Sequence, residues 1–282
     1  MSEAVIECRH LTQYYGAKRI YEDLNFCVKQ GSVVGLLGKN GVGKSTTINI
    51  LMGNLRPTQG ECLIFGEEST RLSAKTRARI GLLYEGHVTY DYLKIKDLYA
   101  LYASEYRAQF KEDRFFELFS KLGVSFEQKI STLSCGQRSQ VVLGLLFASD
   151  PDLLILDDYS LGLDTGYRRL FIDYLREYIK EGNKSVLMTT HIVNDLEGLL
   201  DELVIMRKDA QPLVMDFKSF REGFRGYSLP KSCEYRDIAG IETILELKEE
   251  RQIFGFFKEI PPHAREISLS FEDAFLGYTG RY

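Results

Sequence analysis

The chain has 282 residues, of which 44% are hydrophobic and 27% charged, and its formal net charge is −4. This is the length of one or two domains with enough apolar material for a sizeable core, and the lack of net basic charge argues against nucleic acid as a partner. The five cysteines are scattered without a CxxC pair, which favours a reduced compartment over a disulfide framework or a zinc site.

Short apolar runs alternate with helical patterns along most of the chain. The predicted strands are apolar runs bounded by turn residues, at 33–37, 80–84, 153–156, 185–189 and 203–206. The predicted helices carry apolar residues at helical spacing, at 46–53, 95–106, 114–122, 139–148, 168–181 and 192–200. Such alternation predicts an α/β fold with a mostly parallel sheet covered on both faces.

The pattern weakens after Arg207. Residues 208–282 hold four of the six prolines and mix short strand-like and helical pieces. We therefore expect a small appended subdomain there.

The stretch GKNGVGKST matches the phosphate-binding pattern G-x-x-x-x-G-K-[ST] and stands between a predicted strand and a predicted helix. Its glycines let backbone N–H groups turn toward phosphate oxygens, and the helix that follows adds its positive N-terminal end. Lys44 can reach the β- and γ-phosphates, and the Ser45 hydroxyl can ligate Mg²⁺. The alternative is a plain glycine-rich turn, which the flanking strand and helix disfavour. The candidate nucleotide-binding residues here are Gly38, Lys39, Asn40, Gly41, Val42, Gly43, Lys44, Ser45 and Thr46.

The run LLILDD, residues 153–158, is an apolar strand that stops on two adjacent carboxylates. In P-loop ATPases a second strand ends on an aspartate that faces Mg²⁺. We expect Asp157 to hold the metal through water and Asp158 to lie nearer the attacking water. The alternative is a strand end capped by two solvated acids.

Between these two motifs lies LSCGQ, residues 133–137, at the start of a predicted helix. At this point the chain resembles the ATP-binding cassette (ABC) transporter ATPases, whose signature is LSGGQ, over roughly residues 4–206. The resemblance implies ATP and Mg²⁺ as cofactors. It also implies an α/β fold of the P-loop NTPase type: a mostly parallel sheet with helices on both faces, antiparallel N-terminal strands, an α-helical subdomain and a small α+β C-terminal extension. The ABC ATPase domain would span residues 1–207, its helical subdomain approximately 87–150, and the accessory subdomain 208–282.

In the family that the chain resembles, two cassettes pair head to tail, and each ATP lies between the P-loop of one and the signature of the other. Carried over, Ser134, Gly136 and Gln137 would face the nucleotide bound to the partner cassette, and Asp164 in SLGLD would cross the dimer interface. Tyr15 in LTQYYG matches the aromatic residue that stacks on adenine. Tyr14 is its rival, and ordinary strand aromatics are the alternative.

The resemblance also assigns residues beside the γ-phosphate. Glu85 in IGLLYEG falls at the Q-loop position, which contacts the metal and water and senses the membrane subunit. His191 in LMTTHIVNDLE matches the histidine that touches the γ-phosphate. The implied catalytic residues are Asp158, His191 and Glu85, and the implied metal ligands are Ser45, Asp157 and Glu85.

The chain departs from the family pattern at several positions. Asp158 stands where the catalytic residue is usually Glu, which withdraws the carboxylate by roughly 1 Å and predicts slow hydrolysis. Tyr159 replaces the usual Pro, and Cys135 replaces the first signature glycine, at a cost of order 1 kcal/mol if that position needs positive φ. Glu85 stands where Gln is commoner, and Lys39 where Pro is frequent.

The main expectation is the ATP-hydrolysing subunit of an ABC transporter, acting with a second ABC ATPase subunit as a homo- or heterodimer. The closing FEDAFLGYTGR is similar to the tail of ATPases that serve two-gene exporters of drugs, antibiotics and peptides. No apolar run approaches the ~20 residues that span a bilayer, so a separate membrane-spanning subunit is expected, with this chain peripheral at the cytoplasmic face of the cell membrane. The Tyr-rich stretch 89–106 lies where the family docks that subunit, and a packed helical subdomain is the alternative there.

Two other functions stay open. One is a switch that dimerises on ATP with little hydrolysis, which Asp158 and Cys135 keep in play. The other is a soluble ABC-type ATPase acting on ribosomes or DNA, disfavoured by the single cassette and the absence of net basic charge.

Overall fold

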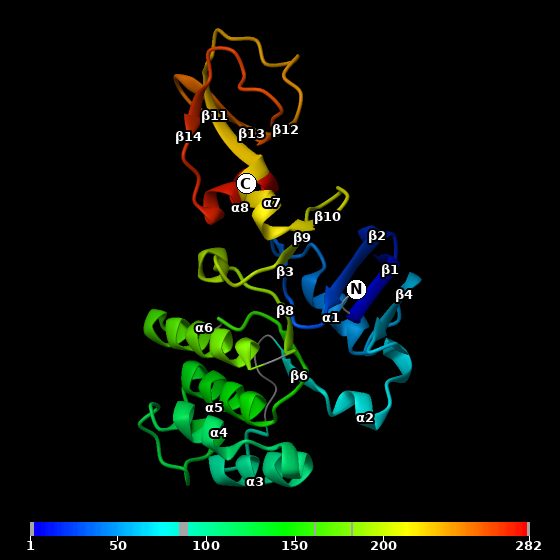
Figure 1. Ribbon diagram of the computed structural model, residues 1–282, viewed down its shortest axis with the longest axis vertical. Coiled ribbons are helices and arrows are strands. Elements are labelled where there is room, and N and C mark those ends of the chain that lie inside the picture. The colour runs from blue at the N-terminus through cyan, green and yellow to red at the C-terminus, as the bar shows by residue number, and fades with distance from the viewer. Residues whose placement is uncertain (1–2, 85–89, 161, 182, 281–282) are drawn as a thin grey trace.

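The computed structural model describes residues 3–84, 90–160, 162–181 and 183–280. The molecule is elongated, with a helical group at one end, the sheets in the middle and the C-terminal elements at the other end (Figure 1).

A six-stranded sheet with the order β10-β9-β3-β8-β7-β6 forms the centre. Five of its strands are parallel: β3 (Val33–Gly38), β6 (Ile80–Leu83), β7 (Leu153–Leu156), β8 (Ser185–Met188) and β9 (Glu202–Met206). The strand β10 (Leu213–Asp216) joins the edge in antiparallel direction. The carboxyl ends of β3, β7 and β8 therefore meet at one edge, where ligands bind in open α/β sheets.

Alternate residues of these strands enter two different hydrophobic cores, because side chains alternate across a strand. Leu154 and Leu156 face one core, which contains residues of α5 (Cys135–Ala148) and α6 (Thr165–Lys180). Leu153 and Ile155 face the other, with α1 (Lys44–Leu51). The continuous apolar run thus reflects a strand buried on both sides, and the predicted α/β class is confirmed.

The second face is covered chiefly by a small sheet rather than by helices. Its order is β2-β1-β4-β5, with antiparallel pairing throughout. The strands are β1 (Ala4–Tyr15), β2 (Lys18–Lys29), β4 (Gln59–Ile64) and β5 (Glu67–Glu68), and the short helix α2 (Ala74–Arg77) follows them. Apolar residues of β1, β2 and β4 share one core with α1.

Three helices form the group at the end of the molecule away from the C-terminal elements (Figure 1). They are α3 (Ile95–Tyr106), α4 (Glu112–Phe119) and α5. Phe115 is fully buried among Tyr99, Phe119 and other aromatic residues, with ring centroids 5.0 and 5.2 Å away from it. The α5 helix joins this group to the central sheet. Some of its residues pack into the core that Leu154 and Leu156 face, and others pack into the core of the helical group, which contains Phe115.

The C-terminal elements build a third sheet with the order β12-β13-β11-β14. Its members are β11 (Phe224–Pro230), β12 (Ile241–Glu246), β13 (Glu250–Phe256) and β14 (Arg265–Ile267), flanked by α7 (Phe217–Gly223) and α8 (Phe271–Thr279). Phe220, Phe254 and Phe271 belong to the same core cluster as Leu203 of β9. The two predicted parts on either side of residue 207 are thus packed on one continuous core.

The helix predicted at 192–200 is wrong: the structure has only a 3-10 turn at Val193–Leu196. Gly198 has a φ of 76°, in the left-handed region, which ends any helix there. The Asn194 side chain is also occupied, since it donates to Glu272 of α8 at 2.8 Å and accepts from the backbone N–H of the same residue at 3.1 Å. Among the described residues, no helix has the length and apolar character needed to cross a bilayer.

Candidate functional site

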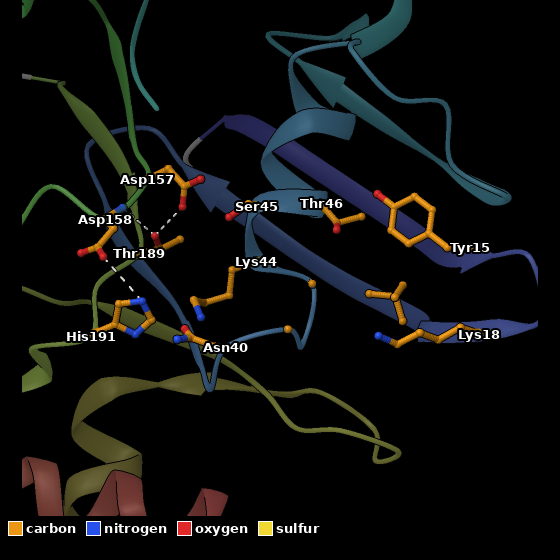
Figure 2. A pocket seen from close by; sticks show the side chains of 13 residues that line it. Tyr15, Lys18, Asn40, Lys44, Ser45, Thr46, Asp157, Asp158, Thr189 and His191 are labelled. Carbon is orange, nitrogen blue, oxygen red and sulfur yellow. Dashed lines mark hydrogen bonds and ion pairs between the residues drawn. The ribbon is translucent and has the colours of Figure 1, made fainter. Parts of the chain in front are cut away.

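A cavity of about 370 Å³ opens where the carboxyl ends of β3, β7 and β8 meet the start of α1. Figure 2 shows Ser45 and Thr46 between the Asp157–Asp158 pair on one side and Tyr15 on the other. The cavity is lined by Tyr15, Lys18, Ile20, Asn40, Gly41, Gly43, Lys44, Ser45, Thr46, Asp157, Asp158, Thr189 and His191.

The loop from β3 to α1 has a backbone that demands glycine. Gly43, the residue before α1, has φ 110°, and a Cβ there would lie 2.6 Å from Ile20 Cγ2 and 2.8 Å from the Tyr21 ring. Gly41 has φ 80° and faces open space, so its backbone is accessible to a ligand. Successive N–H groups in such a turn, at the positive end of a helix, form a concave anion site.

Lys44 begins α1 and is buried, with its ammonium group at the mouth of this loop. Its Nζ donates to the carbonyl oxygens of Gly38 at 2.8 Å and Lys39 at 3.0 Å. Thr47, one turn into the helix, is held by the Gly43 carbonyl at 2.9 Å and by Tyr21 OH at 3.2 Å. The lysine side chain is therefore curled along the loop toward the concave face on which phosphate oxygens would lie.

Asp157 and Asp158 follow β7 and enter the same cavity, only 2% and 6% exposed. Thr189, just after the neighbouring strand β8, donates its hydroxyl to Asp157 Oδ1 at 2.8 Å and accepts from the backbone N–H of Asp158 at 2.9 Å. His191 Nε2 lies 3.5 Å from Asp158 Oδ2 (Figure 2). The alternative of two solvated acids is therefore wrong, because both carboxylates are buried and partnered.

Tyr15 is half exposed at the end of β1 and lines the cavity, together with Lys18 and Ile20 from the start of β2. Tyr14 is not among the lining residues, and its backbone N–H donates to Thr58 Oγ1 at 3.1 Å on the neighbouring segment. Of the two aromatic candidates, Tyr15 is the one that lines the cavity.

Comparison with known proteins places this site in a family. The family model described as "ABC transporter" matches residues 21–160. The Nod factor export ATP-binding protein I of Paraburkholderia xenovorans (strain LB400) is 32% identical over 215 residues, which cover 74% of this chain and 69% of that protein. The chain belongs to the ABC transporter ATP-binding family. The predicted resemblance is confirmed, and the protein is an ABC ATPase.

Solved structures agree with this ABC ATPase fold. The ATP-binding subunit of an ABC transporter is similar, with a TM-score of 0.67 and 26% identity, over 77% of this chain and 92% of that one. A dimeric ATP-binding cassette in a post-hydrolysis state, bound to ADP and Pi, has a TM-score of 0.64 over 75% of this chain and 98% of that one. At 20% identity, that second likeness supports the fold alone.

The signature of this ABC ATPase forms the start of α5. Ser134 accepts from the backbone N–H of Gln137 at 3.2 Å, while Gln137 Oε1 accepts from the backbone N–H of Ser134 at 3.0 Å. This reciprocal capping box satisfies two N–H groups at the helix start. Cys135 is the first helical residue and does not have positive φ, so replacing the family glycine strains no backbone.

Four predicted nucleotide contacts of the ABC ATPase lie away from the cavity in this single chain. Ser134, Gly136 and Gln137 do not line it. Asp164 does not line it either, and serves as the N-cap of α6 by accepting from the backbone N–H of Tyr167 at 2.8 Å.

The residues of this ABC ATPase that could hold Mg²⁺ have suitable chemistry. Ser45 and Asp157 line one cavity and offer hydroxyl and carboxylate oxygens, the donors that Mg²⁺ prefers. Among residues 3–84 and the other described ranges, no cluster of three or more His, Cys, Asp and Glu side chains could hold a metal alone. This donor set fits an ion that keeps its waters and shares phosphate oxygens. Glu85 lies outside the described residues.

The sequence predictions missed several residues that line the cavity. They also included some residues that the structure places outside it. Thr189 was missed because its contacts depend on the pairing of β7 with β8, although its place after a strand, two residues before His191, was a signal. Lys18 and Ile20 were missed because a hairpin brings β2 back to the end of β1. Among the described loop residues, Gly38, Lys39 and Val42 do not line the cavity. Lys39 and Val42 instead line a neighbouring cavity of about 480 Å³.

Proposed function

We propose that this chain is the ATP-hydrolysing subunit of an export-type ABC transporter. Two cassettes close on ATP and drive a separate membrane-spanning subunit. The observation that carries the proposal is one cavity in which Lys44 and Ser45, at the start of α1, meet Asp157, Asp158 and His191 from two adjacent strands.

The nucleotide fits this cavity in one direction. The triphosphate takes the concave loop of residues 38–46, where backbone N–H groups, Lys44 and the positive end of α1 favour anions. The base then reaches the Tyr15 ring, which lies on the other side of Ser45 and Thr46 (Figure 2). Lys18 and Ile20, which were not predicted, line the wall on the Tyr15 side.

Hydrolysis follows from the position of Asp158 and His191 beside that loop. A water oxygen attacks the γ-phosphorus in line, the bond to the bridging oxygen breaks, and ADP leaves. Asp158 orients this water and accepts its proton, while His191 contacts the γ-phosphate. Ser45 and Asp157, with Glu85 as a further predicted ligand, would hold Mg²⁺, which would neutralise charge on the phosphates. Catalysis of this kind consists mostly of positioning and charge stabilisation.

A second cassette completes the site. Ser134, Gly136 and Gln137 lie outside the cavity of their own chain, which is compatible with their predicted role toward the nucleotide of a partner. The capping box of Ser134 and Gln137 leaves the positive start of α5 available to that nucleotide's γ-phosphate. The dimeric cassette with ADP and Pi bound is a solved precedent for a dimer of this fold.

The membrane-spanning partner is a separate chain, and this subunit is peripheral at the cytoplasmic face of the membrane. The direction of transport rests on relatives named for export, such as the Nod factor exporter subunit. The helical group supplies the docking region within residues 89–106, where Tyr90 and Tyr92 are exposed. No nucleic acid is expected as a partner.

The test is steady-state ATP turnover of the purified full chain, alone and with its co-purified membrane subunit, with Lys44→Ala as background. We expect Lys44-dependent turnover and ATP-induced dimers of Asp158→Asn in analytical ultracentrifugation. ATP-induced dimers without turnover would favour the switch function instead. Absence of ATP binding would refute both.

A further inference from the structure

Three consecutive residues after β8 serve the two aspartates that follow β7. The strands are parallel neighbours, with Leu156 opposite Met188, so Thr189, Thr190 and His191 leave the sheet beside Asp157 and Asp158. Each of the three takes part in holding one or both aspartates, although only His191 was singled out from the sequence.

The first connection runs through Thr189. The backbone N–H of Asp158 donates to Thr189 Oγ1 at 2.9 Å, and that hydroxyl donates to Asp157 Oδ1 at 2.8 Å. A hydroxyl has one hydrogen to donate, so this hydrogen is committed to Asp157. Thr189 therefore fixes the direction of the Asp157 carboxylate relative to the backbone of Asp158 (Figure 2).

The second connection runs through Thr190 and Ser160. Ser160 Oγ donates to Asp158 Oδ1 at 2.8 Å and lies 3.2 Å from Thr190 Oγ1. Because the single hydrogen of Ser160 goes to the carboxylate, Thr190 must be the donor in the contact between the two hydroxyls. Thr190 Oγ1 in turn accepts from the backbone N–H of Ile192 at 3.0 Å.

This second series of hydrogen bonds runs in one direction, from the backbone N–H of Ile192 through Thr190 and Ser160 to Asp158, and it is buried. Thr190 and Ser160 are 2% and 8% exposed. Hydrogen bonds that polarise one another in a low-dielectric interior are stronger than isolated ones. His191 Nε2 lies 3.5 Å from the other carboxylate oxygen, and Asp158 itself has a φ of 46°, in the left-handed region. One oxygen of the Asp158 carboxylate thus accepts from Ser160, while the other lies beside His191.

We propose that Thr190 and Ser160 are positioning residues for Asp158. This inference rests on the proposed hydrolysis of ATP, in which Asp158 orients the attacking water. The Ser160 hydroxyl, oriented by Thr190, binds one carboxylate oxygen of Asp158. The other oxygen is left facing His191 and the cavity. Neither Ser160 nor Thr190 lines the cavity, so both would act on the chemical step through Asp158 and not on nucleotide binding.

The experiment compares kcat, KM and equilibrium ATP binding in the full chain, for variants that keep or lose the Ser160 or the Thr190 hydroxyl. Ser160→Ala and Thr190→Val should lower kcat by about tenfold or more, because misplacement by about 1 Å can cost a hundredfold. In both variants, the ATP affinity and KM should stay within about twofold of the wild-type values. Thr190→Ser keeps the hydroxyl and should retain at least about half the wild-type kcat.

Ser228→Ala is the matched control. Ser228 is also a buried serine that donates to a carboxylate, that of Glu250, but it lies in β11 outside the site. Its loss should leave kcat unchanged, and thermal melting of all variants reports folding.

The inference is overturned if Ser160→Ala keeps wild-type kcat, or if Thr190→Ser is as impaired as Thr190→Val. A parallel loss of ATP affinity and kcat would also overturn it, since that is the result of a merely structural role. If Thr190→Val does not fold, Ser160→Ala and Thr190→Ser decide the question. Lys44-dependent turnover of the wild-type chain is established first, so a failure of the proposed function is seen separately.

Discussion

Gly136 of the signature and Gly162 of the loop after Asp158 meet backbone to backbone. A Cβ on Gly136 would lie 2.4 Å from the carbonyl oxygen of Gly162, and a Cβ on Gly162 would lie 2.7 Å from Cys135 Sγ. The start of α5 and this loop are thereby packed as one unit in each cassette. In the proposed dimer, the two elements would approach the partner cassette together.

Gly136→Ala should disrupt this packing. The new methyl group meets a backbone oxygen that cannot rotate away, and overpacking of this kind costs about 1–3 kcal/mol. We expect a lower melting temperature and lower turnover, measured by calorimetry and ATPase assay. Cys135→Gly is the control, and should cost under about 1 kcal/mol because Cys135 already has helical φ. Equal stability of wild type and Gly136→Ala would contradict the packing argument.

Asp158→Glu should raise the ATPase rate. The added methylene carries the carboxylate roughly 1 Å further into the cavity, a distance worth up to about a hundredfold in rate. The same change moves the carboxylate away from Ser160. The change in kcat therefore compares the benefit of a longer side chain with the cost of losing the orientation that Ser160 provides. An unchanged or lower kcat would show that the Ser160-held position, and not reach, determines the rate.

Tyr159 replaces a family proline and has become a core residue. It is fully buried and stacked on Phe171, with ring centroids 4.8 Å apart, and burial raises the pKa of its phenol well above the ordinary value. Tyr159→Ala should cost about 3–5 kcal/mol in urea denaturation because it leaves a large cavity. Tyr159→Phe should cost under about 1 kcal/mol, since the hydroxyl contact with Asp195 is long, at 3.5 Å. A large loss in Tyr159→Phe would mean that the hydroxyl matters more than the ring.

Asp150 links α4 to the strands of the central sheet, and its loss should destabilise the chain in a pH-dependent way. Its carboxylate lies 2.6 Å from Arg114 Nη1 and 2.8 Å from Lys184 Nζ. Burial alone would raise the pKa of Asp150, but these two cations lower it below its ordinary value. Asp150→Asn keeps a residue that tolerates the φ of 51° and should cost about 1–3 kcal/mol at pH 7, between the values of surface and buried pairs.

The sign of the pH effect follows from the lowered pKa. The stabilisation by Asp150 is fully present above the pKa of an unfolded aspartate, about 3.9, and is lost as pH falls through the lower folded pKa. The difference between wild type and Asp150→Asn in urea denaturation should therefore be constant from pH 7 to about pH 5 and shrink below about pH 4. Asp173→Asn, in an exposed pair with Arg176, is the control and should stay near zero. A difference that grows on acidification would contradict the assignment.

Much of this fold could be predicted from local patterns. The helix at 95–106 and the strand at 153–156 were predicted with the bounds that the structure has, because apolar spacing and turn residues act over a few positions. The predicted nucleotide-binding loop likewise depends on nine consecutive residues, whose glycines and lysine carry their chemistry wherever a strand leads into a helix. The motif LSCGQ could be interpreted because it lies between the glycine-rich loop and the strand that ends in two acids.

Other features depended on segments that are distant in sequence. The predicted helix at 192–200 failed because Asn194 is bound by α8, more than seventy positions later, and because Gly198 adopts left-handed φ. Whether Cys135 strained the backbone could be answered only by the place where α5 begins. The roles of Thr189 and Ser160 required the pairing of β7 with β8.

The sequence by itself determined that this chain has a strand, a glycine-rich phosphate loop and a helix, followed by a signature and a strand ending in two acids. Its chemistry could be named because short-range spacing sets which backbone and side-chain groups point at a phosphate. Only the tertiary structure decided that both acids are buried, which hydroxyls hold them, and that the signature lies outside the cavity of its own chain. Those properties arise from parallel strand pairing and core packing, which join residues that no local pattern brings together.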